Sequence, residues 1–171
     1  MALVIPEKVS DLFYVCEDGH VRNKINRRNG TIAAGNISGF IWTKKDKDIK
    51  YRQISLDGKR FYAHRIAWFL HYNEQPPAII DHIDGDGFNN SKDNLRSANS
   101  AQNRNNSKLS KNNTSGVKGV YWNTKRRKWS AQIWHRGRSI KLGQYSSLQE
   151  ASKVVKEARI KYHKEFANEG V

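Results

Sequence analysis

The stretch from Asp81 to Asn103, DHIDGDGFNNSKDNLRSANSAQN, brings together the residue types that can hydrolyse a phosphodiester bond. Hydrolysis near neutral pH needs a base that activates water and a cation that stabilises charge on the phosphorus centre and the leaving oxygen. Histidine suits the first task, whereas carboxylate and amide oxygens suit a hard divalent cation. Because Mg²⁺ commonly takes only one or two protein ligands, one Asp and one Asn can suffice.

The same letters can also be read as a calcium-binding loop. In HIDGDGFNNSKD, Asp84, Asp86 and Gly87 fall at suitable offsets. However, His82 stands at the first ligand position and Asp93 replaces the closing glutamate. We therefore favour the other interpretation of Asp84 and Asp86, in which each side chain bonds a nearby backbone amide in a turn beside a glycine.

Four motifs, AHRIAWFL, IDHIDGDGFNN, DNLR and SAQN, follow one another along the chain. Through them, residues 12 to 106 resemble the HNH endonucleases, specifically the phage and intron-encoded homing endonucleases. The resemblance implies a ββα-metal motif over about residues 64 to 106, with His82 as general base and Asp81 and Asn103 as metal ligands. Since neighbouring residues of a strand point to opposite faces, Asp81 and His82 can share a site only at a strand end or distortion.

The resemblance also implies the surroundings and products of the reaction. Asn94 would hold the loop so that His82 is oriented, and Arg65 would contact a phosphate near the cut, with His64 beside it. The enzyme would hydrolyse double-stranded DNA with Mg²⁺, for which Mn²⁺ would substitute, and would leave 5′-phosphate and 3′-hydroxyl ends. The alternative for the His-Arg pair is a buried or capping His64 beside a solvated Arg65 at the start of a helix.

Short strands and turns are predicted from residue 12 to residue 63. Among them, the Asp57-Gly58 pair between YRQISL and KRFYAH predicts a β-hairpin. The spacing in HRIAWFLHY predicts a short helix, which Pro76-Pro77 prevents from continuing. Residues 79 to 106 read as strand, loop, strand or turn, and helix.

A polar stretch, NRNNSKLSKNNTSG, is too rich in Asn, Ser and Lys to bury a core. It predicts a linker at residues 107 to 115, between a nuclease domain of residues 1 to 106 and a C-terminal domain of residues 116 to 171. The expected fold class is α+β: a ββα-metal nuclease domain followed by a small domain in which a three-stranded antiparallel sheet packs on one helix.

The strands of that C-terminal domain are predicted at residues 117–122, 129–135 and 138–142. Ser147 followed by Glu150 forms the capping-box pattern that begins a helix, and apolar residues then recur at helical spacing. Alternation along the second strand leaves Trp134 on the face that does not meet the helix.

The net charge of +15 indicates a polyanionic partner, with nucleic acid as the first candidate. Residues 108 to 171 hold 15 basic and 4 acidic residues, so this third of the chain carries most of the charge. Its motifs SGVKGVYW, KWSAQIW, IKLGQYSSLQEA and HKEFAN resemble the APETALA-type domain of plant ethylene-response factors, which docks a three-stranded sheet in the major groove. The DNA contacts expected from the basic rim and from this resemblance are Lys118, Tyr121, Asn123, Lys125, Arg126, Arg127, Lys128, Gln132, Trp134, Arg136, Arg138, Ser139 and Lys141.

Cys16 is the single cysteine, which excludes an internal disulfide and a cysteine-based zinc ribbon and favours a reducing cytosol, the host's if a phage encodes the chain. No apolar run approaches the length that spans a bilayer, so no membrane association is expected. We expect a site-selective DNA endonuclease, as a monomer or homodimer. The alternatives left open are a DNA-binding regulator with a vestigial nuclease motif and an enzyme that acts on RNA, whose narrow major groove fits a sheet poorly.

Overall fold

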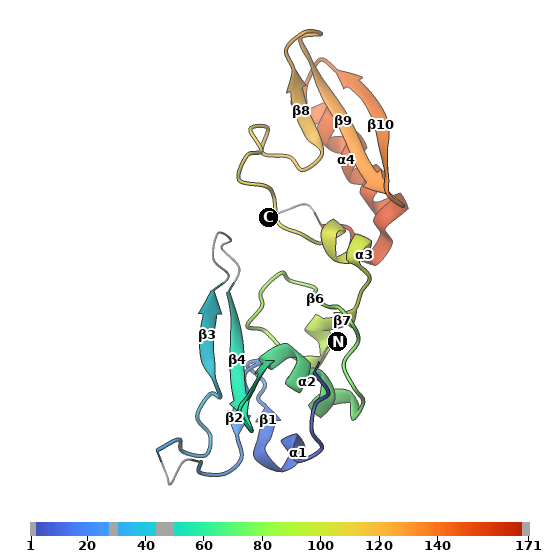
Figure 1. Ribbon diagram of the computed structural model, residues 1–171. Helices are drawn as coiled ribbons and strands as arrows, with labels where there is room; N and C mark the ends of the chain where they lie inside the picture. The colour runs from blue at the N-terminus through green and yellow to red at the C-terminus, as the bar shows by residue number, and fades with distance from the viewer. Residues whose placement is uncertain (1–2, 28–30, 44–49, 169–171) are drawn as a thin grey trace. The chain divides into compact units, whose positions relative to one another are not determined.

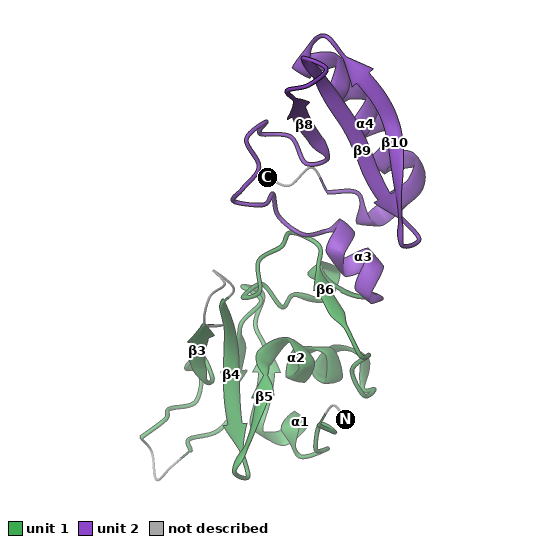
Figure 2. Ribbon diagram, turned by 45° about the horizontal axis from the view of Figure 1, so that its top comes forward, with its two compact units in different colours: residues 1–98 green, residues 99–171 purple. Residues whose placement is uncertain are grey.

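A computed structural model describes residues 3–27, 31–43 and 50–168, and contacts divide the chain into two units, Met1–Ala98 and Asn99–Val171 (Figure 2). Each unit combines helices with small antiparallel sheets, so the predicted α+β class is confirmed at this level. None of the helices described is long and apolar enough to cross a membrane.

The first unit contains a two-stranded, a three-stranded and a second two-stranded antiparallel sheet, with strand orders β1-β2, β3-β4-β5 and β6-β7 (Figure 1). Its elements are α1 (Val9–Leu12), β1 (Phe13–Val15), β2 (Val21–Asn23), β3 (Phe40–Thr43), β4 (Lys50–Leu56), β5 (Lys59–Tyr62), α2 (Ala63–Tyr72), β6 (Ile80–His82), a 3₁₀ turn (Lys92–Asn94) and β7 (Leu95–Ser97). The core lies between α1, α2 and the strands and includes Phe13, Ile54, Phe61 and Ile66.

Local chemistry explains where these elements turn and stop. Asp57 and Gly58 have φ angles of +50° and +72°, which suit the tight turn that joins β4 to β5. Helix α2 ends at Tyr72 and is followed by Asn73 in the left-handed conformation, three residues before Pro76. Both the hairpin and the helix are therefore confirmed.

Two elements of the first unit were not predicted, the short helix α1 and strand β3. Strand β3 lies at the edge of its sheet and has no buried residue, with Phe40 and Ile41 both exposed. A half-buried strand is recognised by its alternation of buried and exposed positions, and β3 lacks that pattern. Residues 28–30 and 44–49, within the same Gly-bearing stretch, lie outside the described part of the chain.

The second unit has the predicted sheet and helix. Its elements are α3 (Ser100–Asn105), β8 (Val120–Asn123), β9 (Lys128–His135), β10 (Arg138–Tyr145), α4 (Leu148–His163) and a 3₁₀ turn (Lys164–Phe166). The antiparallel sheet has the order β10-β9-β8, and α4 lies along one of its faces (Figure 1). Ser147 accepts a hydrogen bond from the Glu150 amide, as the capping pattern predicts. Val120, Ala131 and Ile133 meet Ala151, Val155 and Ala158 in a separate core.

The division between the units falls after Ala98, whereas the sequence predicts a linker at residues 107 to 115. The difference arises because α3 belongs with the chain that follows it. The ammonium group of Lys118 donates to the carbonyl oxygens of Asn105 and Ser107, and the amide of Asn168 donates to Asn106. A polar composition does not reveal such contacts, because they join residues 11 to 62 positions apart.

Candidate active site and basic sheet

Strands β6 and β7 bring Asp81 opposite Arg96. The Arg96 Nε and Nη2 atoms lie 2.8 and 2.7 Å from Asp81 Oδ2, and the Asp81 side chain is only 4% exposed. Charged pairs of this kind are among the stronger hydrogen bonds in proteins, so the pair stabilises an otherwise costly buried charge. The strand register thus places Asp81 against Arg96, and His82 follows it as the last residue of β6.

His82 is the last residue of β6, and its side chain is buried at 7% exposure. Its Nε2 atom lies 3.2 Å from Asn90 Oδ1. Burial lowers the pKa of His82, although the bond to Asn90 and the nearby carboxylates of Asp84 and Asp81 oppose that shift. The imidazole is therefore neutral at pH 7, which is the form that a general base requires.

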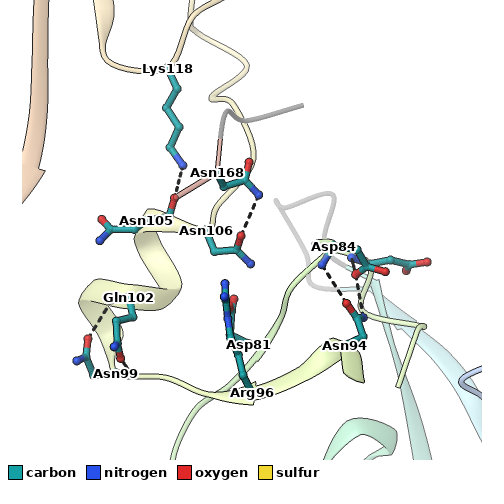
Figure 3. Close-up of polar contacts among 11 residues, drawn as sticks. Asp81, Asp84, Asn94, Arg96, Asn99, Gln102, Asn105, Asn106, Lys118 and Asn168 are labelled. Atoms are coloured by element: carbon teal, nitrogen blue, oxygen red, sulfur yellow. Dashed lines mark hydrogen bonds and ion pairs between the residues drawn. The ribbon is translucent and has the colours of Figure 1, made fainter. Parts of the chain in front are cut away.

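Asn94 ties the loop together from inside (Figure 3). Its Oδ1 accepts from the Asp84 amide at 3.0 Å, while its Nδ2 donates to Asp84 Oδ1 at 2.9 Å and to the Asn89 carbonyl oxygen at 2.7 Å. Three hydrogen bonds from one buried side chain hold residues 84 to 89 in place. This geometry suits the expected role of Asn94, and the role itself remains a prediction.

The predicted turns around Asp84 and Asp86 are confirmed. Asp84 Oδ1 accepts from the Asp86 amide and Asp86 Oδ1 accepts from the Phe88 amide, at 2.8 and 2.9 Å. Burial would raise the pKa of Asp84, but hydrogen bonds from Asp86, Asn89 and Asn94 outweigh it and lower that pKa. The ionised Asp84 is therefore an acceptor within the loop.

His64 lies among aromatic rings next to His82. Its ring stacks on Tyr62 and meets Tyr51 and His82 edge-on, with centroid distances of 5.3, 5.3 and 5.5 Å. Burial lowers the pKa of His64 to about 3, and repulsion from the Arg65 cation, and from His82 when that ring is protonated, adds to the effect. His64 is thus a neutral ring, and any contact with a phosphate would be through an N–H donor rather than a cation.

Arg65 points its guanidinium at the chain that follows helix α2. Its Nη1 donates to the Pro77 carbonyl oxygen at 2.9 Å and its Nη2 donates to that of Pro76 at 3.3 Å. These bonds anchor the turn after the helix, which is a structural task. The expected phosphate contact of Arg65 remains a prediction.

Asn103 lies on α3, in the second unit, with an exposed side chain. The helix begins with a capping box in which Asn99 accepts from the Gln102 amide and the Gln102 side chain accepts from the Asn99 amide (Figure 3). Within residues 3–27, 31–43 and 50–168, no three His, Cys, Asp or Glu side chains gather as a metal site. The predicted ligands, one carboxylate and one amide oxygen, would suit Mg²⁺, which keeps several waters, better than Zn²⁺.

Comparison with known proteins bears on this same segment. Residues 61–105 match the HNH endonuclease family model. The chain is also similar to Protein 3.8 of Escherichia phage T7, with 44% identity over 59 residues, which are 34% of this chain and 49% of that protein. The matched part thus spans about half the length of this curated relative. No solved structure matches the chain. The HNH match contains Asp81, His82, Asn94 and Asn103 and ends before the basic sheet.

Outside the HNH segment, the strand register of the second unit gathers most of the expected DNA contacts on one face. Cross-strand partners share a face of a sheet, and residues two apart on a strand do so too. The face turned away from α4, here called the open face, holds Tyr121, Asn123, Lys128, Gln132, Trp134, Ser139 and Lys141. Trp134 and Tyr121 are 56% and 46% exposed there. An exposed aromatic with basic and amide neighbours is what a sheet that binds nucleic acid needs.

The other expected contacts lie elsewhere. Lys125, Arg127 and Arg136 occupy exposed turns, and Arg138 pairs with His135, which puts it on the opposite face. Arg126 reaches the open face, where its Nη1 donates to Gln144 at 3.1 Å. Burial lowers the pKa of Lys118 to about 8, and its ammonium group is engaged at the end of α3. Its role in DNA contact remains a prediction.

Two residues of the site were missed by the sequence analysis, Asn90 and Arg96. Arg96 belongs to the DNLR motif, and its pairing with Asp81 follows only from the β6–β7 register. Asn90 follows another asparagine in a loop, so nothing local distinguishes it. Its importance comes from contacts with His82 and with Gly19, 71 residues away.

Proposed function

We propose that this protein is a metal-dependent endonuclease that hydrolyses double-stranded DNA. His82 takes the proton from a water molecule, and the resulting hydroxide attacks phosphorus in line with the leaving 3′ oxygen. Asp81 and Asn103 are the proposed ligands of a divalent cation, Mg²⁺ or Mn²⁺. When bound, such a cation supplies positive charge that stabilises the phosphorane and the leaving oxygen. The products are 5′-phosphate and 3′-hydroxyl ends.

The observation that carries the proposal is the state of His82. A buried imidazole with a lowered pKa stands beside a buried carboxylate, inside a segment that matches the HNH endonuclease family. A structural histidine would not need the ion pair of Asp81 beside it or a loop fixed by Asn94. The ββα-metal motif fits the chain order β6, loop, β7 and α3.

The open face of the second unit is the proposed site of DNA binding. Its strand order and its exposed Trp134 support a sheet that lies against the duplex, as in the APETALA-type domains that its motifs resemble. Basic side chains on the face and in its turns would contact phosphates, and Gln132 and Trp134 would reach the bases. A sheet that binds at a preferred sequence makes the enzyme site-selective, as expected of a phage or homing endonuclease.

A DNA-binding regulator with a vestigial nuclease motif is the second candidate. The ion pair between Arg96 and Asp81 favours it, because a guanidinium within 2.8 Å of Asp81 competes with a cation for the same carboxylate. However, a carboxylate offers about four lone-pair sites on its two oxygens, so an arginine on Oδ2 is compatible with metal ligation. Both candidates bind DNA, and they differ in whether they cut it.

Incubation of plasmid and phage DNA with the protein in Mg²⁺, in Mn²⁺ and in EDTA tests the proposal. We expect cutting with either metal and none in EDTA, ends that DNA ligase reseals, and loss of cutting in Asp81→Ala and Asn103→Ala. Intact DNA in both metals, together with tight binding in a gel-shift assay, would instead support the regulator. Equal cutting of duplex RNA would overturn the assignment of DNA as substrate.

A further inference from the structure

Asn90 is the most enclosed polar side chain of the loop, at 2% exposure, and it contacts His82 directly. Its Nδ2 atom donates to the carbonyl oxygens of Gly19 and Phe88, at 3.1 and 3.0 Å. Its backbone amide also donates to Gly19, and His71 Nε2 donates to its backbone carbonyl at 2.9 Å. The residue is therefore held by the β1–β2 turn, by its own loop and by helix α2.

These bonds leave one orientation for the Asn90 amide. Both neighbours of Nδ2 are carbonyl oxygens, which only accept, so the donating end of the amide must face them. The Oδ1 atom then faces His82, and an amide oxygen also only accepts. The proton of the neutral His82 ring must therefore be on Nε2, which leaves the basic lone pair on Nδ1.

The β1–β2 turn approaches the loop closely enough to require glycine. Gly19 has a φ of +74°, and a Cβ added there would lie 2.6 Å from Asn89 Oδ1 and 2.8 Å from the Asn90 amide nitrogen. Because the backbone of this turn touches Asn90 without an intervening side chain, the Gly19 carbonyl can accept two hydrogen bonds from one residue.

We propose that Asn90, held by the Gly19 turn, is a positioning residue that keeps His82 in the Nε2–H form and presents Nδ1 to the attacking water. The proposal rests on the proposed function, since it assigns the proton acceptor of the same reaction to one nitrogen. It also gives the β1–β2 turn a role in catalysis, because this turn holds the Asn90 amide that orients His82. A buried asparagine that merely joined turn and loop would contribute to stability without selecting a tautomer.

The tautomer can be read from the wild-type protein. Protein labelled with ¹⁵N-histidine, in EDTA at about pH 8, where a histidine ring is neutral, gives long-range ¹H–¹⁵N correlations that identify the protonated nitrogen. The His82 signals are those missing in His82→Gln. We expect a protonated Nε2 and an unprotonated Nδ1. A protonated Nδ1 would overturn the proposal, whether or not any variant folds.

The matched variants are Asn90→Ala and Asn23→Ala. Asn23 is equally buried in the same unit, and its amide also donates to a backbone carbonyl, that of Asn36. We expect kcat for DNA cleavage to fall about 10- to 100-fold in Asn90→Ala at unchanged KM, and within about twofold of wild type in Asn23→Ala. Wild-type kcat in a folded Asn90→Ala would overturn the proposal.

Failure of this inference is distinguishable from failure of the proposed function. Wild-type protein that leaves DNA intact in Mg²⁺ and Mn²⁺ would overturn the proposed function. Wild-type protein that cuts DNA but has its His82 proton on Nδ1 would overturn only the role of Asn90.

Discussion

The loop of residues 81 to 94 and the open face of the β8–β10 sheet are both polar, but their side chains are held very differently. In the loop, Asn94 and Asn90 are buried and each makes three or more hydrogen bonds within the unit. On the sheet, Trp134 is more than half exposed. A reaction centre needs groups fixed before the substrate arrives, whereas a binding face gains its partners from the substrate.

The difference follows from how the side chains of each region affect the stability of the folded chain. Buried amides stabilise a single loop conformation only while every donor and acceptor is matched, so one substitution leaves several groups unsatisfied. An exposed tryptophan and nearby cations contribute little to folding, and the positive charges repel one another. We therefore expect substitutions in the loop to change chemistry, and substitutions on the sheet to change binding.

Among the substitutions that test this comparison, the largest effect is expected from Asn94→Ala, which removes three hydrogen bonds from the loop. Displacement of His82 by about an ångström can lower a rate about 100-fold, so kcat should fall by that order while DNA affinity persists. Rates and gel shifts measured on the same preparations test this. The control is Asn113→Ala, which loses a carbonyl contact in the second unit. Equal rates in the two variants would contradict the account.

Trp134→Ala is expected to weaken DNA binding about 10- to 100-fold, because a large exposed aromatic on a binding face often dominates binding. The rate of cutting at saturating enzyme should not change. Trp122 is 43% exposed and pairs with Trp129, whose face carries α4. Trp122→Ala is therefore the matched control, and fluorescence anisotropy gives both affinities. Equal losses from the two tryptophans would show that the open face is not the binding face.

Acid should destabilise the first unit through His64, which lies on α2. Its pKa falls from 6.5 to about 3 on folding, so between these values the unfolded chain binds a proton that the folded chain does not. The free energy of unfolding then decreases as pH falls, by up to about 1.4 kcal/mol for each pH unit below 6.5. Urea unfolding at pH 7 and pH 5 measures the decrease. We expect the free energy of unfolding of His64→Gln to decrease less than that of wild type between these pH values. An equal decrease in the two proteins would show that His64 is not the group responsible.

The smallest expected effect is a change in the salt dependence of DNA binding, which should distinguish Lys141 from Lys118. Lys141 is exposed on the open face, whereas the Lys118 ammonium is engaged by Asn105 and Ser107. If Lys141 contacts a phosphate, Lys141→Ala should lower the slope of log affinity against log salt by about 1. Lys118→Ala should leave that slope unchanged and lower the thermal midpoint instead. A reduced slope in Lys118→Ala would show that Lys118 does contact a DNA phosphate.

The elements that were predictable are those that local chemistry decides. Asp57-Gly58 adopts a turn that few other pairs can adopt, and Ser147 with Glu150 marks the start of α4. The alternation on β9 correctly put Trp134 opposite the helix. In each case the residues that decide the structure lie within a few positions of one another.

The parts that were not predictable depend on contacts between distant residues. Asn90 is held by a hydrogen bond to Gly19, and Arg96 is paired with Asp81 by the strand register. Lys118 was predicted as a DNA contact from the resemblance to the APETALA-type domain, and the position of its ammonium at the end of α3 could not be foreseen from that resemblance. A cation or an amide in a loop has many possible partners, and only the folded backbone selects one.

The central claim is that His82 is the base of a DNA-cutting centre, and one paired measurement tests it most directly. Wild type and His82→Ala are compared in single-turnover cleavage of plasmid DNA with Mg²⁺, and in binding of the same DNA in EDTA. The account predicts that the DNA affinity of His82→Ala stays within about twofold of the wild-type affinity. Its cleavage rate should fall by at least about 100-fold. A folded His82→Ala protein that cuts at the wild-type rate would contradict it.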